Sequence, residues 1–422
     1  MREMKDSGVA WIGVIPQDWE IVRTKSLYCS AKEIAGDRAD DFERLALTLN
    51  GVIKRSKEDS VGLQPEKFSG YQILKKGELV FKLIDLENVA TSRVGLSPYT
   101  GIVSPAYIVL SKQSRAKDLV VRYSMYHFLS MWQREIFNQM GDNGVRSSLN
   151  AKELLNIPHP FPSIYEQKRI VTFLDAQCAK IDAVLEKTRA SIEEYKKLKQ
   201  AVITQAVTKG IRGDRPMKDS GIEWIGDIPA EWDVIRVKQL LKERNERSKE
   251  GKEEPLSMSQ KVGLVPTKFL ESIPNMASSF VGAKLAYVDD LVFNKLKAHL
   301  GVFSVSRYDG LVSPDYAVYC STGKSNLKYL EYIFKTPQCI GEFRKKSTGI
   351  AAGLMRLYTE GLFSIYLPYP ALSEQEEIAE YLNEKCAGID ALIVKKQQYL
   401  TEIENYKKSL IYEYVTGKKE VV

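Results

Sequence analysis

The sequence predicts an α+β protein built from two similar α/β domains, each followed by a long helix. The two helices are expected to pair as an antiparallel coiled coil with internal pseudo-two-fold symmetry. Three observations predict this architecture. The stretch 163–209 contains neither Gly nor Pro and carries one apolar stripe, the same stretch returns 208 residues later, and a motif at the N-terminus returns 213 residues later.

The first long helix is expected over 163–209. Apolar residues recur there at alternating steps of four and three, which is the pattern of a coiled-coil seam. The spacing of Ser163 and Glu166 fits a capping box at the start of the helix. A helix with a single apolar stripe needs a partner to bury it. The expected seam residues are Leu174, Cys178, Ile181, Leu185, Ile192, Tyr195 and Val202.

The partner helix is expected in the same chain, over 371–416. A shift of 208 residues without a gap places Glu166 and Gln167 on Glu374 and Gln375. The chain therefore carries the same long helix twice. An internal repeat of this kind has to be recognised before the rest of the fold is interpreted. The expected seam residues of the second copy are Leu382, Cys386, Ile389, Ile393, Leu400, Ile403 and Leu410.

The segments before the helices form a second repeat. MKDSGVAWIGVIPQDW (4–19) returns as MKDSGIEWIGDIPAEW (217–232), and GIVSPAYIVL (101–110) returns as GLVSPDYAVY (310–319). We interpret the Pro and Trp residues of the first motif as a fixed turn whose indoles pack on a core. The middle of each copy differs. The predicted organisation is a domain over 1–162, a helix over 163–209, a domain over 210–370 and a helix over 371–416.

Length and composition narrow the class of protein. A chain of 422 residues is too long for one core, and its 44% apolar content is typical of globular proteins. The net charge of +7 and pI of about 8.8 favour a polyanionic partner. No apolar run approaches the roughly 18 residues of a membrane span, and the N-terminus lacks a signal-peptide core. Five cysteines without a Cys-x-x-Cys motif indicate a reduced cytoplasm, which is the predicted location.

The sequence contains no recognisable catalytic constellation, so we predict no catalytic residues and no metal ligands. Gly-Lys-Ser within STGKSNL (321–327) lacks the Gly that a phosphate-binding loop requires five residues earlier. The histidines at 127, 159 and 299 have no His or Cys at metal-ligand spacing. We expect His159 to be solvated or packed, and consider His299 for a polar contact.

Basic and polar clusters are the candidates for DNA contact, because Arg, Lys, Asn, Gln and Ser contact phosphates and base edges. Each cluster alone is typical of a solvated surface, but clusters occur at similar places in both copies. In the first copy the candidates are Asn50, Lys54, Arg55, Ser56, Lys57, Asn143, Arg146 and Ser147. In the second copy they are Gln260, Lys261, Asn294, Lys295, Lys297, His299, Arg344, Lys345 and Lys346.

The doubled layout resembles one family of proteins. MKDSGxxWIGxIPxxW opening a unit, Pro-x-Pro-x-x-x-x-Glu-Gln opening a long helix, and one repetition of the whole resemble the specificity subunit of type I restriction–modification enzymes. The resemblance covers essentially the whole chain. It implies two target recognition domains that each read half of a bipartite, asymmetric DNA sequence, with the helices fixing the spacer between the halves and docking methyltransferase subunits.

The resemblance also implies partners and cofactors. The expected partners are double-stranded DNA, two methyltransferase subunits and restriction subunits, with no membrane. The expected cofactors are S-adenosylmethionine, ATP and Mg, all in the partner subunits and none in this chain. Adenine N6 methylation and ATP-dependent cleavage would then be activities of the partners, so the chain itself is not expected to be an enzyme.

Two other functions remain open from the sequence. A stand-alone DNA-binding regulator with an internal pseudo-dyad would bind DNA without a methyltransferase subunit. A protein-interaction scaffold would lack the fall in DNA affinity with rising salt that phosphate contacts produce.

Overall fold

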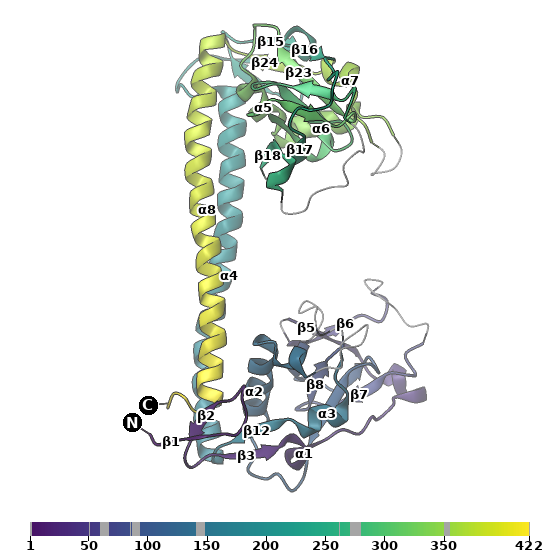
Figure 1. Ribbon diagram of the computed structural model, residues 1–422, viewed down its shortest axis with the longest axis vertical. Helices are drawn as coiled ribbons and strands as arrows, with labels where there is room; N and C mark the ends of the chain where they lie inside the picture. The colour runs from purple at the N-terminus through teal and green to yellow at the C-terminus, as the bar shows by residue number, and fades with distance from the viewer. Residues whose placement is uncertain are drawn as a thin grey trace. The chain divides into compact units, whose positions relative to one another are not determined.

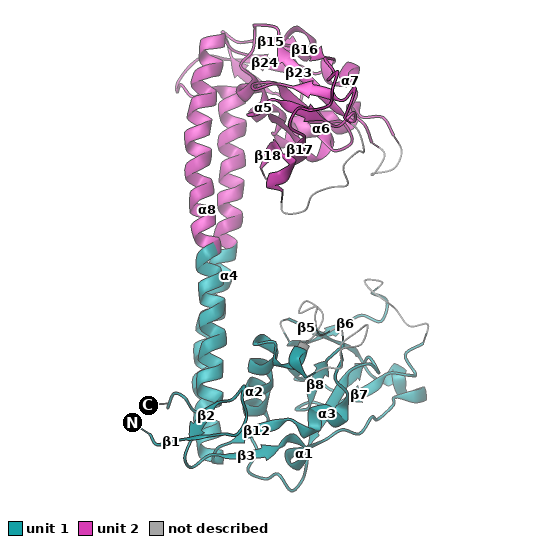
Figure 2. Cartoon of the chain, viewed as in Figure 1, with its two compact units in different colours: residues 1–189, 398–422 teal, residues 190–397 magenta. Residues whose placement is uncertain are grey.

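The chain folds into two compact units, each of which joins a globular head to parts of both long helices (Figure 2). The computed structural model describes residues 2–49, 51–59, 67–84, 86, 93–140, 148–260, 262–270, 280–349 and 355–421. Unit 1 comprises Met1–Arg189 and Gln398–Val422, and unit 2 comprises Ala190–Gln397. Both boundaries between the units therefore lie within the long helices. The predicted boundaries between heads and helices lie at the starts and ends of the helices.

The long helices are α4 (Ile164–Lys209) and α8 (Leu372–Val415), labelled in Figure 1. Both begin one residue after the predicted start. The Ser163 hydroxyl accepts a hydrogen bond from the backbone N–H of Glu166 at 3.2 Å, as an N-cap residue does. The Glu166 carboxylate accepts from the Trp19 indole Nε1–H at 2.8 Å. One of the two hydrogen bonds of the expected capping box is thus present, the one accepted by Ser163. The Glu166 carboxylate instead connects the helix to the N-terminal motif.

The helices lie antiparallel within each unit, because residue numbers rise along α4 as they fall along α8. The ion pairs that join them are Asp182–Lys407 and Arg189–Glu404 in unit 1 and Lys199–Asp390 in unit 2, each at 2.6 Å. Asp182 and Asp390 are equivalent under the 208-residue shift, as are Lys199 and Lys407. The same Asp–Lys pair therefore forms once in each unit, with the helices exchanged.

The predicted seam residues are all buried or half-buried. Those below 9% exposure are Leu174, Cys178, Leu185, Ile192, Leu382, Cys386 and Leu410; the half-buried ones are Ile181, Tyr195, Val202, Ile389, Ile393, Leu400 and Ile403. Near the end of α4, Ile203 is more buried than Val202. The reason is that the ends of the helices pack into the head cores and not only against each other.

The head of unit 1 consists of small sheets with short helices. A four-stranded sheet has the order β4-β11-β8-β9, a second has the order β6-β5-β10-β7, and two-stranded sheets pair β1 with β2 and β12 with β3. The strands are β1 (Met4–Asp6), β2 (Val14–Pro16), β3 (Glu20–Arg23), β4 (Tyr28–Cys29), β5 (Arg44–Thr48), β6 (Gly51–Arg55), β7 (Gln72–Leu74), β8 (Leu79–Lys82), β9 (Arg93–Leu96), β10 (Gly101–Val103), β11 (Ile108–Lys112) and β12 (Pro158–Phe161). The helices are α1 (Thr24–Leu27), η1 (Gly36–Asp41), α2 (Val121–Gln133), η2 (Ile136–Gln139) and α3 (Ala151–Asn156).

The head of unit 2 repeats this plan. Its four-stranded sheet has the order β16-β23-β20-β21, which is the equivalent of β4-β11-β8-β9, and further pairs are β13–β14, β15–β24, β17–β18 and β19–β22. The strands are β13 (Met217–Asp219), β14 (Asp227–Pro229), β15 (Asp233–Arg236), β16 (Leu241–Arg244), β17 (Leu256–Ser259), β18 (Gly263–Pro266), β19 (Lys284–Ala286), β20 (Leu291–Asn294), β21 (Phe303–Val305), β22 (Gly310–Val312), β23 (Tyr316–Ser321) and β24 (Tyr366–Tyr369). The helices are η3 (Val237–Gln239), η4 (Thr267–Phe269), η5 (Ala298–Leu300), α5 (Leu327–Phe334), α6 (Pro337–Lys346) and α7 (Thr359–Phe363).

The repeated motifs of the sequence hold each head to its long helix. Trp19 and Trp232 are buried and donate to Glu166 at 2.8 Å and to Glu374 at 2.9 Å. The following glutamine is also buried in both units. Gln167 accepts from the Val120 backbone N–H at 2.8 Å, and its equivalent Gln375 accepts from Asn326 at 3.0 Å. The Trp motif and the Glu-Gln motif, far apart in the sequence, are therefore parts of one junction.

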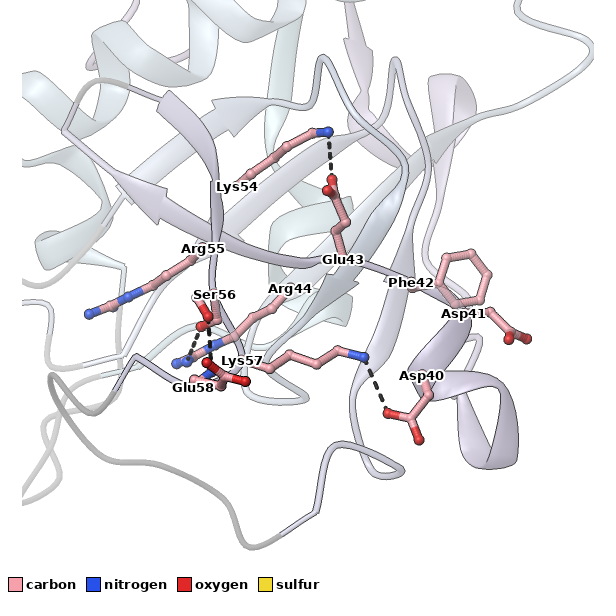
Figure 3. A pocket seen from close by; sticks show the side chains of 10 residues that line it. All are labelled: Asp40, Asp41, Phe42, Glu43, Arg44, Lys54, Arg55, Ser56, Lys57 and Glu58. Atoms are coloured by element: carbon pink, nitrogen blue, oxygen red, sulfur yellow. Dashed lines mark hydrogen bonds and ion pairs between the residues drawn. The ribbon is translucent and has the colours of Figure 1, made fainter.

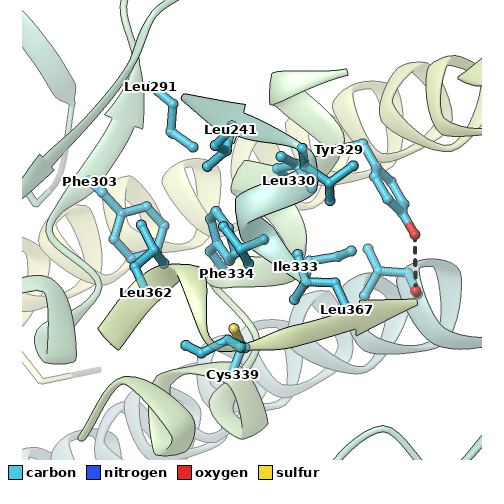
Figure 4. Packing of buried hydrophobic residues seen from close by; sticks show 14 of the residues in the cluster. Leu241, Leu291, Phe303, Tyr329, Leu330, Ile333, Phe334, Cys339, Leu362 and Leu367 are labelled. Atoms are coloured by element: carbon cyan, nitrogen blue, oxygen red, sulfur yellow. Dashed lines mark hydrogen bonds between the residues drawn. The ribbon is translucent and has the colours of Figure 1, made fainter. Parts of the chain in front are cut away.

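Each head is completed by the last turn of the helix that follows the other head. In unit 1, the Tyr123 hydroxyl donates to the Val415 carbonyl at the end of α8, at 2.9 Å. In unit 2, the equivalent Tyr329 hydroxyl donates to the Val207 carbonyl near the end of α4, at 3.4 Å. The core of unit 2 accordingly combines side chains of the head with both helices (Figure 4). One buried cluster in each unit therefore combines side chains of the head with side chains of both helices.

Candidate nucleic-acid interface

Each head carries a β-hairpin in the segment where the two copies differ most in sequence. In unit 1 strands β5 and β6 pair antiparallel from Arg44 opposite Arg55 to Thr48 opposite Gly51. In unit 2 strands β17 and β18 pair antiparallel in the same way. Strand β5 lies parallel to β10, and the residue before β17 forms a parallel bridge to β22, the strand equivalent to β10. The two hairpins therefore occupy equivalent places.

Large apolar side chains are exposed on or beside both hairpins. Leu49 is 69% exposed and Ile53 is 42% exposed in unit 1, while Val262 is 63% and Phe269 is 64% exposed in unit 2. A two-stranded β-ribbon is one of the elements that fit the major groove of DNA, and an apolar side chain can contact the thymine methyl group there. This shape and exposure suit a DNA-reading element.

The structure brings the predicted residues Lys54, Arg55, Ser56 and Lys57 together on β6 and the residues that follow it (Figure 3). They line a surface depression of about 550 Å³ together with acidic side chains from the segment before β5. The ion pairs of these cations are Lys54–Glu43 at 2.6 Å, Arg55–Asp59 at 2.6 Å and Lys57–Asp40 at 3.3 Å. Every cation of the predicted cluster thus has a carboxylate neighbour.

Charge in this depression is balanced. Four acidic side chains (Asp40, Asp41, Glu43 and Glu58) and four basic ones (Arg44, Lys54, Arg55 and Lys57) line it. The hydrogen bond to Glu43 raises the pKa of Lys54, and the hydrogen bond to Asp59 raises the pKa of Arg55. A phosphate group would compete with the carboxylates for these cations.

Several predicted residues of unit 2 gather around η5. The Gln260 side-chain amide donates to the Leu300 carbonyl at 3.1 Å, and Lys297 precedes η5. His299 is only 6% exposed, and burial together with the nearby Arg344 charge lowers its pKa. A buried neutral His299 is poorly placed for the polar contact with DNA considered from the sequence. Lys297 and Arg344 present their side chains at the surface.

The other predicted residues of unit 2 have structural neighbours. Arg344, Lys345 and Lys346 form the last turn of α6, where cations complement the helix dipole, and Lys345 also pairs with Glu342 at 2.7 Å. Lys295 is half-buried, and this burial lowers its pKa. Asn294 accepts from the Leu296 backbone N–H at 3.1 Å. These contacts give Asn294, Lys295 and Lys345 structural partners, as the hairpin cations of unit 1 also have.

Five predicted residues, Asn50, Asn143, Arg146, Ser147 and Lys261, lie outside the described part of the chain. The structure also adds a pair that the sequence did not single out. Lys268 in η4 lies 3.1 Å from Glu254, the residue two positions before β17. The pairing of β17 with β18 brings the two together from 14 residues apart.

No metal-binding group emerges from the described residues, since none of their His, Cys, Asp and Glu side chains form a cluster of three or more suited to an ion. The described helices also include none with the length and apolar character needed to cross a membrane. Within the same residues all five cysteines have free thiols.

Comparison with curated proteins finds relatives over nearly the full length. The specificity subunit of the type I restriction enzyme MjaVIII of Methanocaldococcus jannaschii is 24% identical over 429 residues, which span 96% of this chain and 94% of that protein. A second protein of the same archaeon, provisionally named as the specificity subunit of the enzyme MjaX, is 25% identical over 97% of this chain and 96% of its own. No family model matches the chain.

Comparison with solved structures shows the same fold. A chain from a study of complex assembly and conformational transition of the type I R-M system aligns with a TM-score of 0.70 at 13% identity, over 96% of this chain and 99% of that one. The HsdS subunit from Thermoanaerobacter tengcongensis aligns with a TM-score of 0.50 at 14% identity, over 96% and 98% of the two chains. At such low identity the likeness concerns the fold.

Proposed function

We infer that this chain is the specificity subunit of a type I restriction–modification enzyme. The observation that carries the inference is that the likeness to proteins of that name spans both heads and both long helices, not one module. A specificity subunit is non-catalytic: it selects the DNA sequence on which other subunits act. The stand-alone regulator and the protein scaffold are not favoured.

We further propose a division of labour along the chain. Residues 1–162 and 210–370 are the target recognition domains, each reading one half of a bipartite, asymmetric target. The helices 163–209 and 371–416 set the spacer between the halves and dock the methyltransferase subunits. Two observations support this proposal: the junctions between heads and helices are built alike, and the hairpins that the heads expose differ in sequence.

The partners follow from the same proposal. Two methyltransferase subunits supply S-adenosylmethionine-dependent methylation of adenine, restriction subunits supply ATP- and Mg-dependent cleavage, and the assembly acts on double-stranded DNA in the cytoplasm. The balanced charge of the unit 1 depression supports a reader that binds weakly to arbitrary DNA, because unneutralised cations are the main source of non-specific affinity.

The test is to express the chain with the methyltransferase subunit of its own system and to sequence methylated adenines across a host genome. We expect methylation at one bipartite sequence that requires this chain. Exchange of residues 30–100 for the corresponding segment of a relative should change one half-site and leave the other. Methylation that does not depend on the chain, or sequence-specific DNA binding that excludes the methyltransferase, would refute the proposal.

A further inference from the structure

A glutamate and a lysine form the same ion pair beside the hairpin of each head. In unit 1 the Lys54 ammonium lies 2.6 Å from Glu43, and in unit 2 the Lys268 ammonium lies 3.1 Å from Glu254. All four side chains are 40% exposed or more, so the pairs stand at the surface. Exposed pairs of this kind contribute little to stability, so stability does not account for their presence in both heads.

The two glutamates occupy equivalent backbone positions. The Glu43 carbonyl accepts from the Ile102 N–H at 2.9 Å, and the Glu254 carbonyl accepts from the Leu311 N–H at 2.8 Å. The preceding glycines, Gly101 and Gly310, lie so close that a side chain at either would collide with the glutamate carbonyl. The framework of both heads therefore places the backbone of a glutamate at the base of the hairpin.

The lysines reach these carboxylates by different routes. Lys54 is part of β6 and pairs in register with Leu45, whereas Lys268 belongs to η4 beyond the end of β18. Each ammonium also lies near an exposed aromatic ring: Lys54 is 5.3 Å from the Tyr99 ring centroid and Lys268 is 5.6 Å from that of Phe269. The same arrangement of charges thus arises from unlike sequences. Inheritance of one lysine-containing motif by both heads does not explain it.

We propose that Lys54 and Lys268 are corresponding DNA-phosphate contacts of the two heads, and that Glu43 and Glu254 hold them until a phosphate takes the place of the carboxylate. The inference rests on the proposed function and adds a specificity device to it. A carboxylate beside each contact penalises binding to any DNA backbone. Only a sequence that adds base contacts from the neighbouring hairpin offsets that penalty, so the glutamates favour discrimination over affinity.

The experiment uses the complex of this chain with its methyltransferase subunits and two fluorescent duplexes, one with the sequence that the complex methylates and one of unrelated sequence, titrated between 50 and 200 mM salt. On the methylated sequence, Lys54→Gln should make the slope of log affinity against log salt shallower by about 0.9, the value for one phosphate contact. On the unrelated duplex, Glu43→Gln should raise affinity about fivefold at constant salt, and this gain should vanish in the Glu43→Gln/Lys54→Gln double variant. The Glu254 and Lys268 variants should behave in the same way.

Glu193→Gln is the matched control, because Glu193 pairs with Lys196 at 2.7 Å on the exposed face of α4 and its loss changes the net charge equally. The gain in DNA affinity from Glu193→Gln should be smaller than that from Glu43→Gln. It should persist when Lys196 is also replaced. The proposal is overturned if Glu43→Gln gives the same gain with and without Lys54, or if Lys54→Gln leaves the salt slope unchanged. Either outcome is possible even when the wild-type complex methylates one bipartite sequence. A failure of this proposal is therefore distinguishable from a failure of the proposed function.

Discussion

Unit 1 should lose more stability in mild acid than unit 2, because unit 1 buries two histidines and unit 2 buries one, His299. His159 on β12 is fully buried and contacts α2; its Nδ1 lies 2.8 Å from the Pro160 carbonyl and its Nε2 lies 2.9 Å from the Ser124 hydroxyl. A carbonyl only accepts, so Nδ1 carries the proton and Nε2 accepts from Ser124. The His127 ring lies 4.5 Å from that of His159. Both rings are therefore held in their neutral form.

The structure gives the size of the effect. Burial lowers the pKa of His159 to about 4, while an unfolded chain has a histidine pKa of about 6.5. The unfolded state therefore binds the proton first as the pH falls, so stability is complete above pH 6.5 and is lost towards pH 4. Between pH 7.5 and pH 5.0 this difference amounts to about 2 kcal/mol. Burial also lowers the pKa of His127, which adds loss in the same direction.

Unit 2 supplies the control. The Tyr123 hydroxyl lies 3.3 Å from the Pro160 carbonyl and the Tyr329 hydroxyl lies 3.4 Å from the equivalent Pro368 carbonyl, which fixes the correspondence between the heads. By this correspondence unit 2 replaces the polar group with aliphatic side chains, all three labelled in Figure 4. The pairs are Ser124 with Leu330, His127 with Ile333 and His159 with Leu367.

The assay is hydrogen exchange resolved by peptides of each unit, at pH 7.5 and pH 5.0, corrected for intrinsic rates. Protection in the core of unit 1 should fall by about 2 kcal/mol or more, and protection in unit 2 should change much less. The triple variant Ser124→Leu/His127→Ile/His159→Leu, and the milder His159→Leu, should reduce the loss. Equal losses in both units, or an unchanged loss in both variants, would refute the reasoning.

Three other predictions concern the junctions and helices. Trp19→Phe keeps the aromatic packing but leaves Glu166 without the indole N–H, so unit 1 should lose about 1–2 kcal/mol in urea unfolding; an unchanged stability would mean that the bond is not needed. Leu174→Ala should cost about 3 kcal/mol because Leu174 is fully buried, whereas Leu198→Ala, at a site 49% exposed, should cost less than about 0.5 kcal/mol. A four-residue insertion in both helices, after residues 189 and 397, should lengthen the spacer in the methylated sequence and keep both half-sites; altered half-sites would contradict a spacer role for the helices.

The sequence predicted the long helices well because their signal is local. An apolar stripe that persists over many turns identifies a helix whatever surrounds it, and the bounds of α4 and α8 follow closely. The repeat predicted two like heads, and both contain a four-stranded sheet with the same strand order. The ends of the helices also pack into clusters with head residues, which the apolar stripe alone does not indicate. Leu174 and Val415 share one core although 241 positions separate them in the chain.

Contacts between distant segments were beyond sequence reasoning. Trp19 and Glu166 belonged to two landmarks that each recur, but nothing in either landmark indicates that they touch. One signal in the sequence does link the two landmarks, because both recur with nearly the same shift, 213 and 208 residues. The Glu254–Lys268 pair depended on the register of β17 and β18, which short strands do not define in advance.

Some parts of the two heads are alike and others differ. Under the proposed function, this pattern indicates where changes of sequence can create a new half-site. Residues that join a head to the helices, such as Trp19, Gln167 and Tyr123, have counterparts with the same contacts in unit 2. The interior of the head tolerates a change from a histidine pair to aliphatic side chains, and the hairpin tolerates many changes of sequence around the shared Leu45 and Leu256. A substitution in the hairpin therefore need not disturb the junction. Recognition can diverge in one head while both heads remain attached to the same helix pair.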